Sequence, residues 1–387
     1  MKWERVEIGD FMVSKRKSIN PKKHLEETFE LYSIPSYDEG IPEIAKGKEI
    51  GSSKKLLQNN DILLSRIVPH IRRCWVINSD SDLTKIGSGE WMIFNSSKVI
   101  PNYLKYFFLS DLFSAHFLKD LRGVGGSLLR ANPTITGQIK IPLPPLSEQR
   151  RLTARLDKAD AVRQKSRALV DAYAELGRSV FLEVFGDPVR NERGWEVVEL
   201  VSLIPKNEKI AYGIVQPGKE DPYGTPIIRV KDFHNMEIDS SNLKRVSPKV
   251  DEKHKKTRLK GDEILIACVG SIGKVAIVDK SLQNANIVRA TARIPANKSH
   301  IDRTFLAYYL SSKFVQDYFI KTTRTVSQPT LNIKQIKETP ILLPPLPLQT
   351  RFAAMVANIE AQRRLAERQL EAAEAVFGGV LQGTFEG

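Results

Sequence analysis

Residues 144–185, PPLSEQRRLTARLDKADAVRQKSRALVDAYAELGRSVFLEVF, decide how this chain is organised, because the stretch occurs twice. The second copy begins 200 positions later, at Pro344, with PPLPLQTRFAAMVANIEAQRRLAERQLEAAEAVF. In both copies a diproline is followed by leucine and then, three residues on, by Gln149 or Gln349. Each copy is predicted to be a diproline stop followed by a long helix, placed after a globular segment. The sequence therefore predicts two copies of one unit, a domain and then a helix.

The repeat continues into the globular segments. The first opens with WERVEI at residues 3–8, and the second reopens with WEVVEL at 195–200, after the breaker Gly-Asp-Pro at 186–188. Strand-like apolar runs match as well: 62–65 with 264–266, and 74–77 with 275–278. We expect two α+β domains at 1–146 and 187–346, followed by long helices at 147–186 and 347–387.

The long helices carry a seven-residue period, which is typical of a coiled-coil seam. In the first helix the seam positions are Leu152, Ala159, Ser166, Tyr173 and Val180, with Val162, Leu169 and Leu176 at the second seam position. The second helix repeats the main phase with Phe352, Ile359, Ala366, Ala373 and Val380. Many of these residues are small or polar, so the two helices are expected to pack on each other as a structural spacer.

The chain has 387 residues, 41% of them hydrophobic and 27% charged, which is ordinary for a folded protein of two domains. Its net charge is +14, but residues 147–185 and 347–387 together contribute only +1. The remaining +13 on the domains indicates a polyanionic partner, with nucleic acid as the leading candidate. Net charge alone does not exclude the alternative that this is a basic protein whose charge serves only solubility.

No apolar run reaches the roughly 20 residues that a membrane span needs, and the start MKWERVEIGD does not resemble a signal peptide. We therefore expect a cytoplasmic protein without membrane contact. The two cysteines, Cys74 and Cys268, lie in strand-like runs and are expected to be buried thiols.

The sequence contains no recognisable motif for catalysis. Both diprolines read Leu-Pro-Pro-Leu, whereas an amino-methyltransferase motif would place Asp or Asn before the prolines and an aromatic residue after them. The glycine runs at 123–126 and 270–274 match neither a dinucleotide loop nor a phosphate loop. The histidines lack metal-ligand spacing, and neither half contains a nuclease carboxylate cluster. We expect no catalytic, cofactor or metal site in this chain.

Basic residues near turns and loops are the candidate DNA contacts, because phosphate and base-edge contacts both use Lys and Arg. Any one of them is more often solvated surface, so the loops that recur in both units, 122–130 and 321–328, are the better candidates. The candidates are Arg66, Arg72, Arg73, Arg122 and Arg130 in the first half, and Lys231, Lys255, Lys256, Lys274 and Arg324 in the second.

Taken together, these motifs resemble the DNA specificity subunits of type I restriction-modification systems. The resemblance covers essentially the whole chain. It is carried by the paired Pro-Pro-Leu-x-x-Gln helix starts, by Phe-Gly-Asp-Pro at 185–188 followed by Gly-Trp at 194–195, and by three second-half motifs: IRVKD at 228–232, GDEILI at 261–266 and GSIGKVA at 270–276. In the first half, EIGS at 49–52 and ILLSR at 62–66 resemble another domain type of the same family.

The resemblance implies two target-recognition domains, each recognising one part of a split, asymmetric sequence in double-stranded DNA. It also implies that the helices pair as an antiparallel coiled coil whose length sets the spacer between those parts. Two methyltransferase subunits carrying S-adenosylmethionine would dock on this chain, and restriction/translocase subunits using ATP and Mg would join them. The chain itself would be non-catalytic.

Two other classes of function stay open on the sequence alone. One is a self-sufficient enzyme acting on DNA, which methyl transfer by the purified chain would support. The other is a coiled-coil adaptor that binds only proteins, which an absence of salt-dependent DNA affinity would support.

Overall fold

The two ends of each globular segment meet in a short antiparallel ladder that leads directly into a long helix. Strand β1 (Arg5–Glu7) pairs with β12 (Lys140–Pro142), and α5 (Leu146–Phe185) follows. In the second half, β13 (Glu196–Glu199) pairs with β23 (Pro340–Leu343), and α10 (Leu346–Phe385) follows. The repeat seen in the sequence is therefore a repeat of topology as well.

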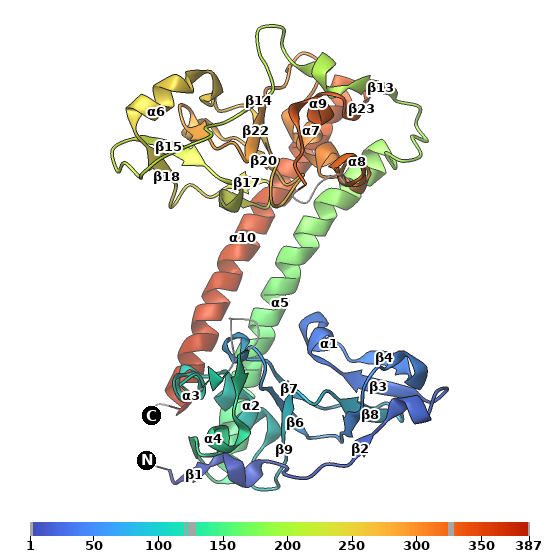
Figure 1. The fold of residues 1–387 in the computed structure, drawn as a ribbon, viewed down its shortest axis with the longest axis vertical. Helices are drawn as coiled ribbons and strands as arrows, with labels where there is room; N and C mark the ends of the chain where they lie inside the picture. The colour runs from blue at the N-terminus through green and yellow to red at the C-terminus, as the bar shows by residue number, and fades with distance from the viewer. Residues whose placement is uncertain (1–2, 120, 123–128, 324–328, 386–387) are drawn as a thin grey trace. The chain divides into compact units, whose positions relative to one another are not determined.

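The structure, a computed structural model, describes residues 3–119, 121–122, 129–323 and 329–385. The chain forms two compact units, and each contains parts of both long helices (Figure 1). Unit 1 comprises Met1–Ala168 with Ala366–Gly387, and unit 2 comprises Leu169–Leu365.

Unit 1 has a lobe beside the long helices and an outer β lobe (Figure 1). The inner lobe holds the sheet β7-β6-β9, formed by β6 (Ile62–Ser65), β7 (Cys74–Val76) and β9 (Trp91–Phe94). Its other elements are α2 (Pro101–Leu109), α3 (Asp111–Phe117), α4 (Pro133–Gly137), β10 (Leu121–Arg122) and β11 (Arg130–Ala131). The outer lobe is the sheet β2-β5-β8-β3-β4 with α1 (Ile34–Glu39). Its strands are β2 (Ser18–Ile19), β3 (Thr28–Tyr32), β4 (Glu43–Lys46), β5 (Lys54–Leu56) and β8 (Thr84–Gly87).

Unit 2 repeats this plan with different sheets. Its inner sheet is β14-β22-β19-β20, formed by β14 (Ala211–Tyr212), β19 (Ile264–Ala267), β20 (Val275–Ile277) and β22 (Thr291–Ile294). The inner helices are α7 (Arg303–Leu310), α8 (Lys313–Thr323) and α9 (Ile333–Lys337). The outer lobe contains β15 (Thr225–Ile228), β16 (Phe233–His234), β17 (Glu237–Ile238), β18 (Lys244–Val246), β21 (Asn286–Ile287) and α6 (Pro248–Lys253). The pairs β3–β8 and β15–β21 are both parallel, so this feature recurs too.

A buried glutamine fixes the start of each long helix. Gln149 accepts a hydrogen bond from the Ile100 N–H at 2.8 Å and donates to the carbonyls of Lys98 at 3.1 Å and Pro144 at 2.9 Å. Gln349 makes the same three bonds, with Asp302 at 2.8 Å, His300 at 3.4 Å and Pro344 at 2.7 Å. The glutamine of the repeated motif thus joins the helix start to the loop before α2 or α7.

The last turns of α10 lie in the core of unit 1. Phe377, Leu381 and Phe385 belong to the same cluster of buried residues as α2. The Phe385 ring lies 5.3 Å from the Tyr103 ring and 5.4 Å from the Phe107 ring, measured between centroids. Burying side chains of this size stabilises unit 1 by about 1.5–3 kcal/mol each.

The last turns of α5 occupy the equivalent place in unit 2. Phe181 and Phe185 join its core, and the Phe185 ring lies 4.7 Å from Phe305 and 5.2 Å from Phe352. Each unit therefore combines the start of one long helix with the end of the other.

Within unit 1 the two helices run antiparallel. The guanidinium of Arg163 covers the Phe377 ring at 4.5 Å, and Arg167 pairs with Glu374 at 2.6 Å. Residue numbers rise along α5 as they fall along α10, which is the antiparallel arrangement that the family resemblance implies.

The main seam of the heptad pattern is confirmed at Leu152 and Phe352, which are both buried. The second seam position was predicted wrongly: Val162, Leu169 and Leu176 are 57%, 40% and 43% exposed. Leu156 on α5 is instead buried, and Arg163, seven residues further along the same face, is half-buried. Arg163 can occupy a seam because its head pairs with Asp160 at 2.5 Å while its guanidinium lies on an aromatic ring.

Among the described residues, neither the long helices nor any shorter one has the length and apolarity that crossing a bilayer requires.

Candidate nucleic-acid interface

Three charged side chains of unit 1 meet where β6, β9 and β11 come together. Arg66 follows β6, Glu90 precedes β9, and Arg130 begins β11. The Arg130 Nη2 lies 3.1 Å from the Glu90 carboxylate, and its Nε lies 3.3 Å away. The Arg66 Nε lies 3.9 Å from the same carboxylate. This ion pair raises the pKa of the Arg130 guanidinium above its ordinary value. Two of the predicted DNA contacts therefore share one carboxylate.

Arg122 lies in β10, and its backbone pairs with that of Arg130 in an antiparallel ladder. Most of the loop between them, residues 123–128, lies outside the described residues. The ladder nevertheless places both ends of that loop beside the cluster formed by Arg66, Glu90 and Arg130.

Arg72 and Arg73 are engaged elsewhere in unit 1. Arg72 donates to the Leu109 carbonyl at 3.1 Å and pairs with Asp111 at 2.7 Å, at the junction of α2 and α3. Arg73 holds both oxygens of Asp38 with its fork, at 2.6 and 2.7 Å, and its side chain is 11% exposed. That contact also lowers the pKa of Asp38. Both arginines connect elements of the fold, and their role in DNA contact stays a prediction.

Two predicted lysines of unit 2 lie beside the β16–β17 hairpin. Lys231 is exposed on the 3-10 turn η7 (Val230–Asp232), immediately before the hairpin. Lys274 donates its Nζ to the carbonyl of Phe233 at 2.5 Å. The structure therefore brings together two candidates that are 43 residues apart in the sequence.

Two further predicted lysines of unit 2, Lys255 and Lys256, lie on a turn whose backbone is held in place. Lys255 and Lys256 are both exposed on the 3-10 turn η8 (Lys255–Thr257), and Lys255 pairs with Glu252 at 2.9 Å. The buried Thr257 hydroxyl donates to the Asn286 side chain at 2.7 Å. The backbone of the turn is thus held while its lysines extend into solvent.

Arg324, the remaining candidate, lies outside the described residues. The loop that contains it returns to the inner sheet through a bridge between Val269 and Thr330. In unit 1 the corresponding bridge joins Ile67 and Arg130. In both units the residue that follows or ends the recurrent loop therefore lies against the turn that follows a central strand.

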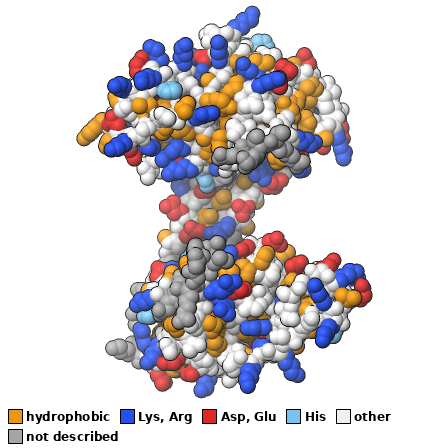
Figure 2. Space-filling model, viewed as in Figure 1, with side chains coloured by type: hydrophobic (Ala, Val, Ile, Leu, Met, Phe, Trp, Pro, Cys, Tyr) orange, Lys and Arg blue, Asp and Glu red, His pale blue; other side chains and the backbone are white. Residues whose placement is uncertain are grey.

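These sites can bind an anion and donate hydrogen bonds to base edges, because they are made of Lys and Arg on turns. On the face drawn in Figure 2, Lys and Arg side chains are spread over both units with acidic side chains among them. In the described part of the chain, His, Cys, Asp and Glu form no group of three that could hold a metal ion.

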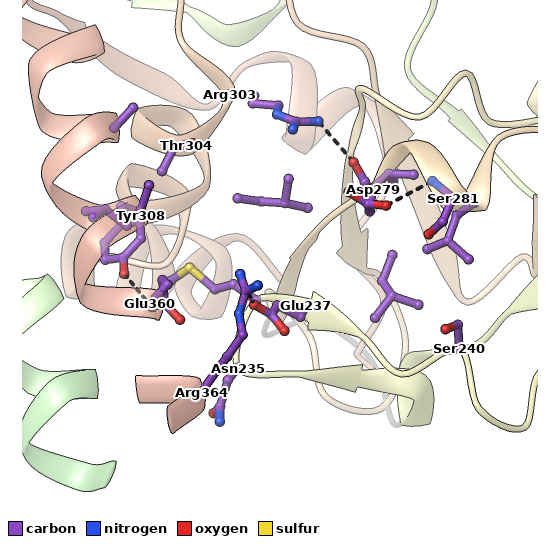
Figure 3. Close-up of a pocket in the computed structure, with 18 residues that line it drawn as sticks. Asn235, Glu237, Ser240, Asp279, Ser281, Arg303, Thr304, Tyr308, Glu360 and Arg364 are labelled. Atoms are coloured by element: carbon purple, nitrogen blue, oxygen red, sulfur yellow. Dashed lines mark hydrogen bonds and ion pairs between the residues drawn. The ribbon is translucent and has the colours of Figure 1, made fainter. Parts of the chain in front are cut away.

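Unit 2 also contains an open pocket of about 400 Å³, which residues of the β16–β17 hairpin, the end of β20, α7 and α10 line (Figure 3). Its labelled side chains pair across the walls. Glu237 of the hairpin lies 3.1 Å from Arg364 of α10, and the Tyr308 hydroxyl of α7 donates to Glu360 at 3.2 Å. The Glu237–Arg364 pair ties the hairpin to α10 at the edge of the pocket.

Sequence reasoning did not single out Glu90. An alignment of the two halves could have drawn attention to it. Strands β9 and β22 align with an offset of 200 residues, so that Glu90 is aligned with the uncharged Ala290. No local motif marks its role, since its two arginine partners are distant in sequence.

Comparison with known proteins gives this geometry its context. The family model described as the type I restriction modification DNA specificity domain matches residues 1–169 and 192–375. The EcoBI specificity subunit of a type I restriction enzyme from Escherichia coli is 29% identical over 62% of this chain and 56% of its own length. The MjaVIII specificity subunit from Methanocaldococcus jannaschii is 22% identical over 98% of this chain and 92% of its own length. The chain thus spans little more than half of the first relative and almost all of the second.

Solved structures share the fold over the whole length. A type I restriction-modification S subunit from M. genitalium has a TM-score of 0.54, with 13% identity, over 99% of this chain and 96% of its own. A chain from a study of assembly and conformational transition in a type I system has a TM-score of 0.52, with 19% identity, over 98% and 97%. The tandem family match, which covers most of the chain, and the repeated fold lead to one conclusion: the chain belongs to the DNA specificity family of type I restriction-modification systems.

Proposed function

We propose that this chain recognises a bipartite, asymmetric sequence in double-stranded DNA, one part through the first domain and the other through the second. The observation that carries the proposal is the repeated backbone frame with different side chains. In both units the recurrent loop returns to the same turn, at Ile67 in one and Val269 in the other. Two similar frames with different side chains suit a target whose two parts differ.

The proposal assigns the spacing between the two parts to α5 and α10. Each helix has 40 residues, which corresponds to a length of about 60 Å at about 1.5 Å per residue. Each also contributes residues to both units, so we expect a change of helix length to change the spacing of the two recognised parts.

The same proposal gives the chain a scaffolding role in a larger complex. Val162, Leu169 and Leu176 recur every seven residues on α5 and are exposed, and an exposed apolar stripe of this kind suits a protein partner. We assign this stripe to adenine methyltransferase subunits that carry S-adenosylmethionine. Restriction subunits would supply ATP and Mg, and this chain, without a catalytic centre of its own, would position both partners.

Domain exchange tests the recognition part of the proposal. Replacing residues 1–146 by another domain of the same kind should change one part of the methylated sequence and leave the other intact. Methylome sequencing of cells that carry the exchanged chain and its methyltransferase measures this directly. A change in both parts would contradict separate recognition.

Helix length tests the spacing part. Insertion of one heptad into both α5 and α10 keeps the seam in register and should lengthen the unrecognised spacer while both sequence parts persist. Insertion into one helix alone is the matched control, because it breaks the register and should abolish methylation. An unchanged spacer in the doubly extended chain would refute the role of the helices.

A further inference from the structure

The turn after β6 is held by a small set of backbone contacts in unit 1. The Arg66 N–H donates to the Glu90 carbonyl at 3.0 Å, and the Ala131 N–H donates to the Arg66 carbonyl at 2.8 Å. Ile67 bridges to Arg130 in the same place. This frame holds three chain segments together independently of their side chains.

Unit 2 contains the same frame after β19. The Cys268 N–H donates to the Ala290 carbonyl at 2.7 Å, and the Leu331 N–H donates to the Cys268 carbonyl at 2.9 Å. Val269 bridges to Thr330. The two frames are therefore equivalent in their backbone hydrogen bonds. These bonds identify which residue of unit 1 corresponds to which residue of unit 2.

The paired positions differ completely in charge. The equivalent pairs are Arg66 with Cys268, Glu90 with Ala290, and Arg130 with Thr330. Three charged residues of unit 1 are thus matched by three uncharged residues of unit 2. Because the backbone frame is complete in both units, the fold does not require these charges.

The charges of unit 1 are partly exposed. The side chains of Arg66, Glu90 and Arg130 are 35%, 31% and 40% exposed. Lys55 lies nearby and donates to the carbonyl of Trp91 at 3.3 Å. Burial first, and then the charge of Arg66, lower the pKa of Lys55. The site carries more positive than negative charge, and its groups can be reached from solvent.

The presence of Glu90 favours a contact to DNA bases over a contact to the phosphate backbone. A carboxylate repels phosphate, so a site that binds only the DNA backbone is weakened by having one at its centre. A guanidinium that recognises guanine instead benefits from a fixed orientation, because it must present two donors to O6 and N7 together. Glu90 supplies that orientation, because it holds Arg130 by both Nε and Nη2.

We propose that Arg66, Glu90 and Arg130, here called the Glu90 cluster, determine the sequence preference of unit 1 by recognising a G·C base pair. In this cluster an arginine contacts guanine, and Glu90 acts as its positioning residue. Unit 2 has no charged counterpart at the three equivalent positions and uses other residues for its own part of the target. The inference rests on the proposed function, since it names the chemistry of one half of that recognition.

The test is selection of bound sequences from randomised DNA by the full chain assembled with its methyltransferase partner. Arg130→Ala should reduce the preference for one G·C pair by about 5- to 150-fold, in the part of the target that changes when residues 1–146 are exchanged. The other part should stay unchanged. Arg130→Lys should have the same effect, because lysine keeps the charge and loses the fork.

Glu90→Gln is the most discriminating variant, because it keeps the side-chain size and removes the negative charge. Under the proposal it lowers the preference for the G·C pair while non-specific affinity is kept or increased. Arg190→Ala is the matched control, since Arg190 is 71% exposed and paired with Glu192 on the turn after α5. It also removes one positive charge, and it should leave both sequence parts unchanged.

Three results would overturn the inference. An unchanged preference in Arg130→Lys and Glu90→Gln would mean that the cluster is a structural ion pair. A uniform loss of affinity in Arg130→Ala, with full preference retained in Arg130→Lys, would mean a phosphate contact. A changed preference only in the target part that the second domain recognises would mean that the cluster does not recognise the part assigned to unit 1. Failure of the proposed function is a separate result, because the unaltered chain would then select no sequence at all.

Discussion

Replacement of Phe385 by alanine should destabilise unit 1, even though this residue follows the second domain in the sequence. Phe385 is 1% exposed and packs against the rings of Tyr103 and Phe107. Removing a buried phenylalanine ring costs about 3–5 kcal/mol, from lost burial and the cavity left behind. A tenfold change in an equilibrium corresponds to about 1.4 kcal/mol, so opening of unit 1 should become about a hundred- to several-thousand-fold more frequent.

Amide hydrogen exchange followed by mass spectrometry is the suitable assay, because a protein with two units need not unfold in one step. In Phe385→Ala the amides of α2 should exchange faster, while those of α7 keep their protection. Phe185→Ala is the matched variant, because Phe185 ends the other long helix and contacts Phe305 in unit 2. It should produce the opposite pattern.

The reasoning would be refuted if Phe385→Ala exposed α7 and left α2 protected. That result would mean that α10 stabilises only the domain that precedes it. Equal exposure of both helices in each variant would also contradict the assignment, because it would mean that the two units open together.

Further predictions concern other buried polar groups. Gln149→Leu leaves the Ile100 N–H unpaired, so urea unfolding of unit 1 should show a loss of about 1–3 kcal/mol for that group. Asp251 of unit 2 is hydrogen-bonded by Arg258 and Asn286. Burial alone would raise its pKa, but these bonds outweigh burial and lower it. The stabilisation is therefore complete above the unfolded pKa of about 3.9 and lost as pH falls through the lower folded value. Asp251→Asn should make unit 2 less stable at pH 7, with a flatter dependence of urea midpoint on pH below about 4.

The sequence alone was sufficient for the repeat, the two long helices and the family. Proline pairs, heptad spacing and a repeated glutamine are local signals, and they can be recognised without knowing what contacts what. Gln149 and Gln349 illustrate this, because both the motif and its three hydrogen bonds recur. The basic turns were also predictable as a class, since their charge and position are visible along the chain.

Only the tertiary structure decided which of these residues act together. Arg66 and Arg130 are 64 residues apart, and they meet at Glu90, which no motif marks. The apolar pattern predicts that Val162 lies in a seam, yet Arg163 lies there, since an aromatic ring and a carboxylate satisfy its guanidinium. Both arrangements depend on side chains that folding brings together from distant parts of the chain. The order of residues along the sequence does not show which side chains these are. The sequence therefore determined the repeated plan, and long-range contacts determined where its charges and helix ends are used.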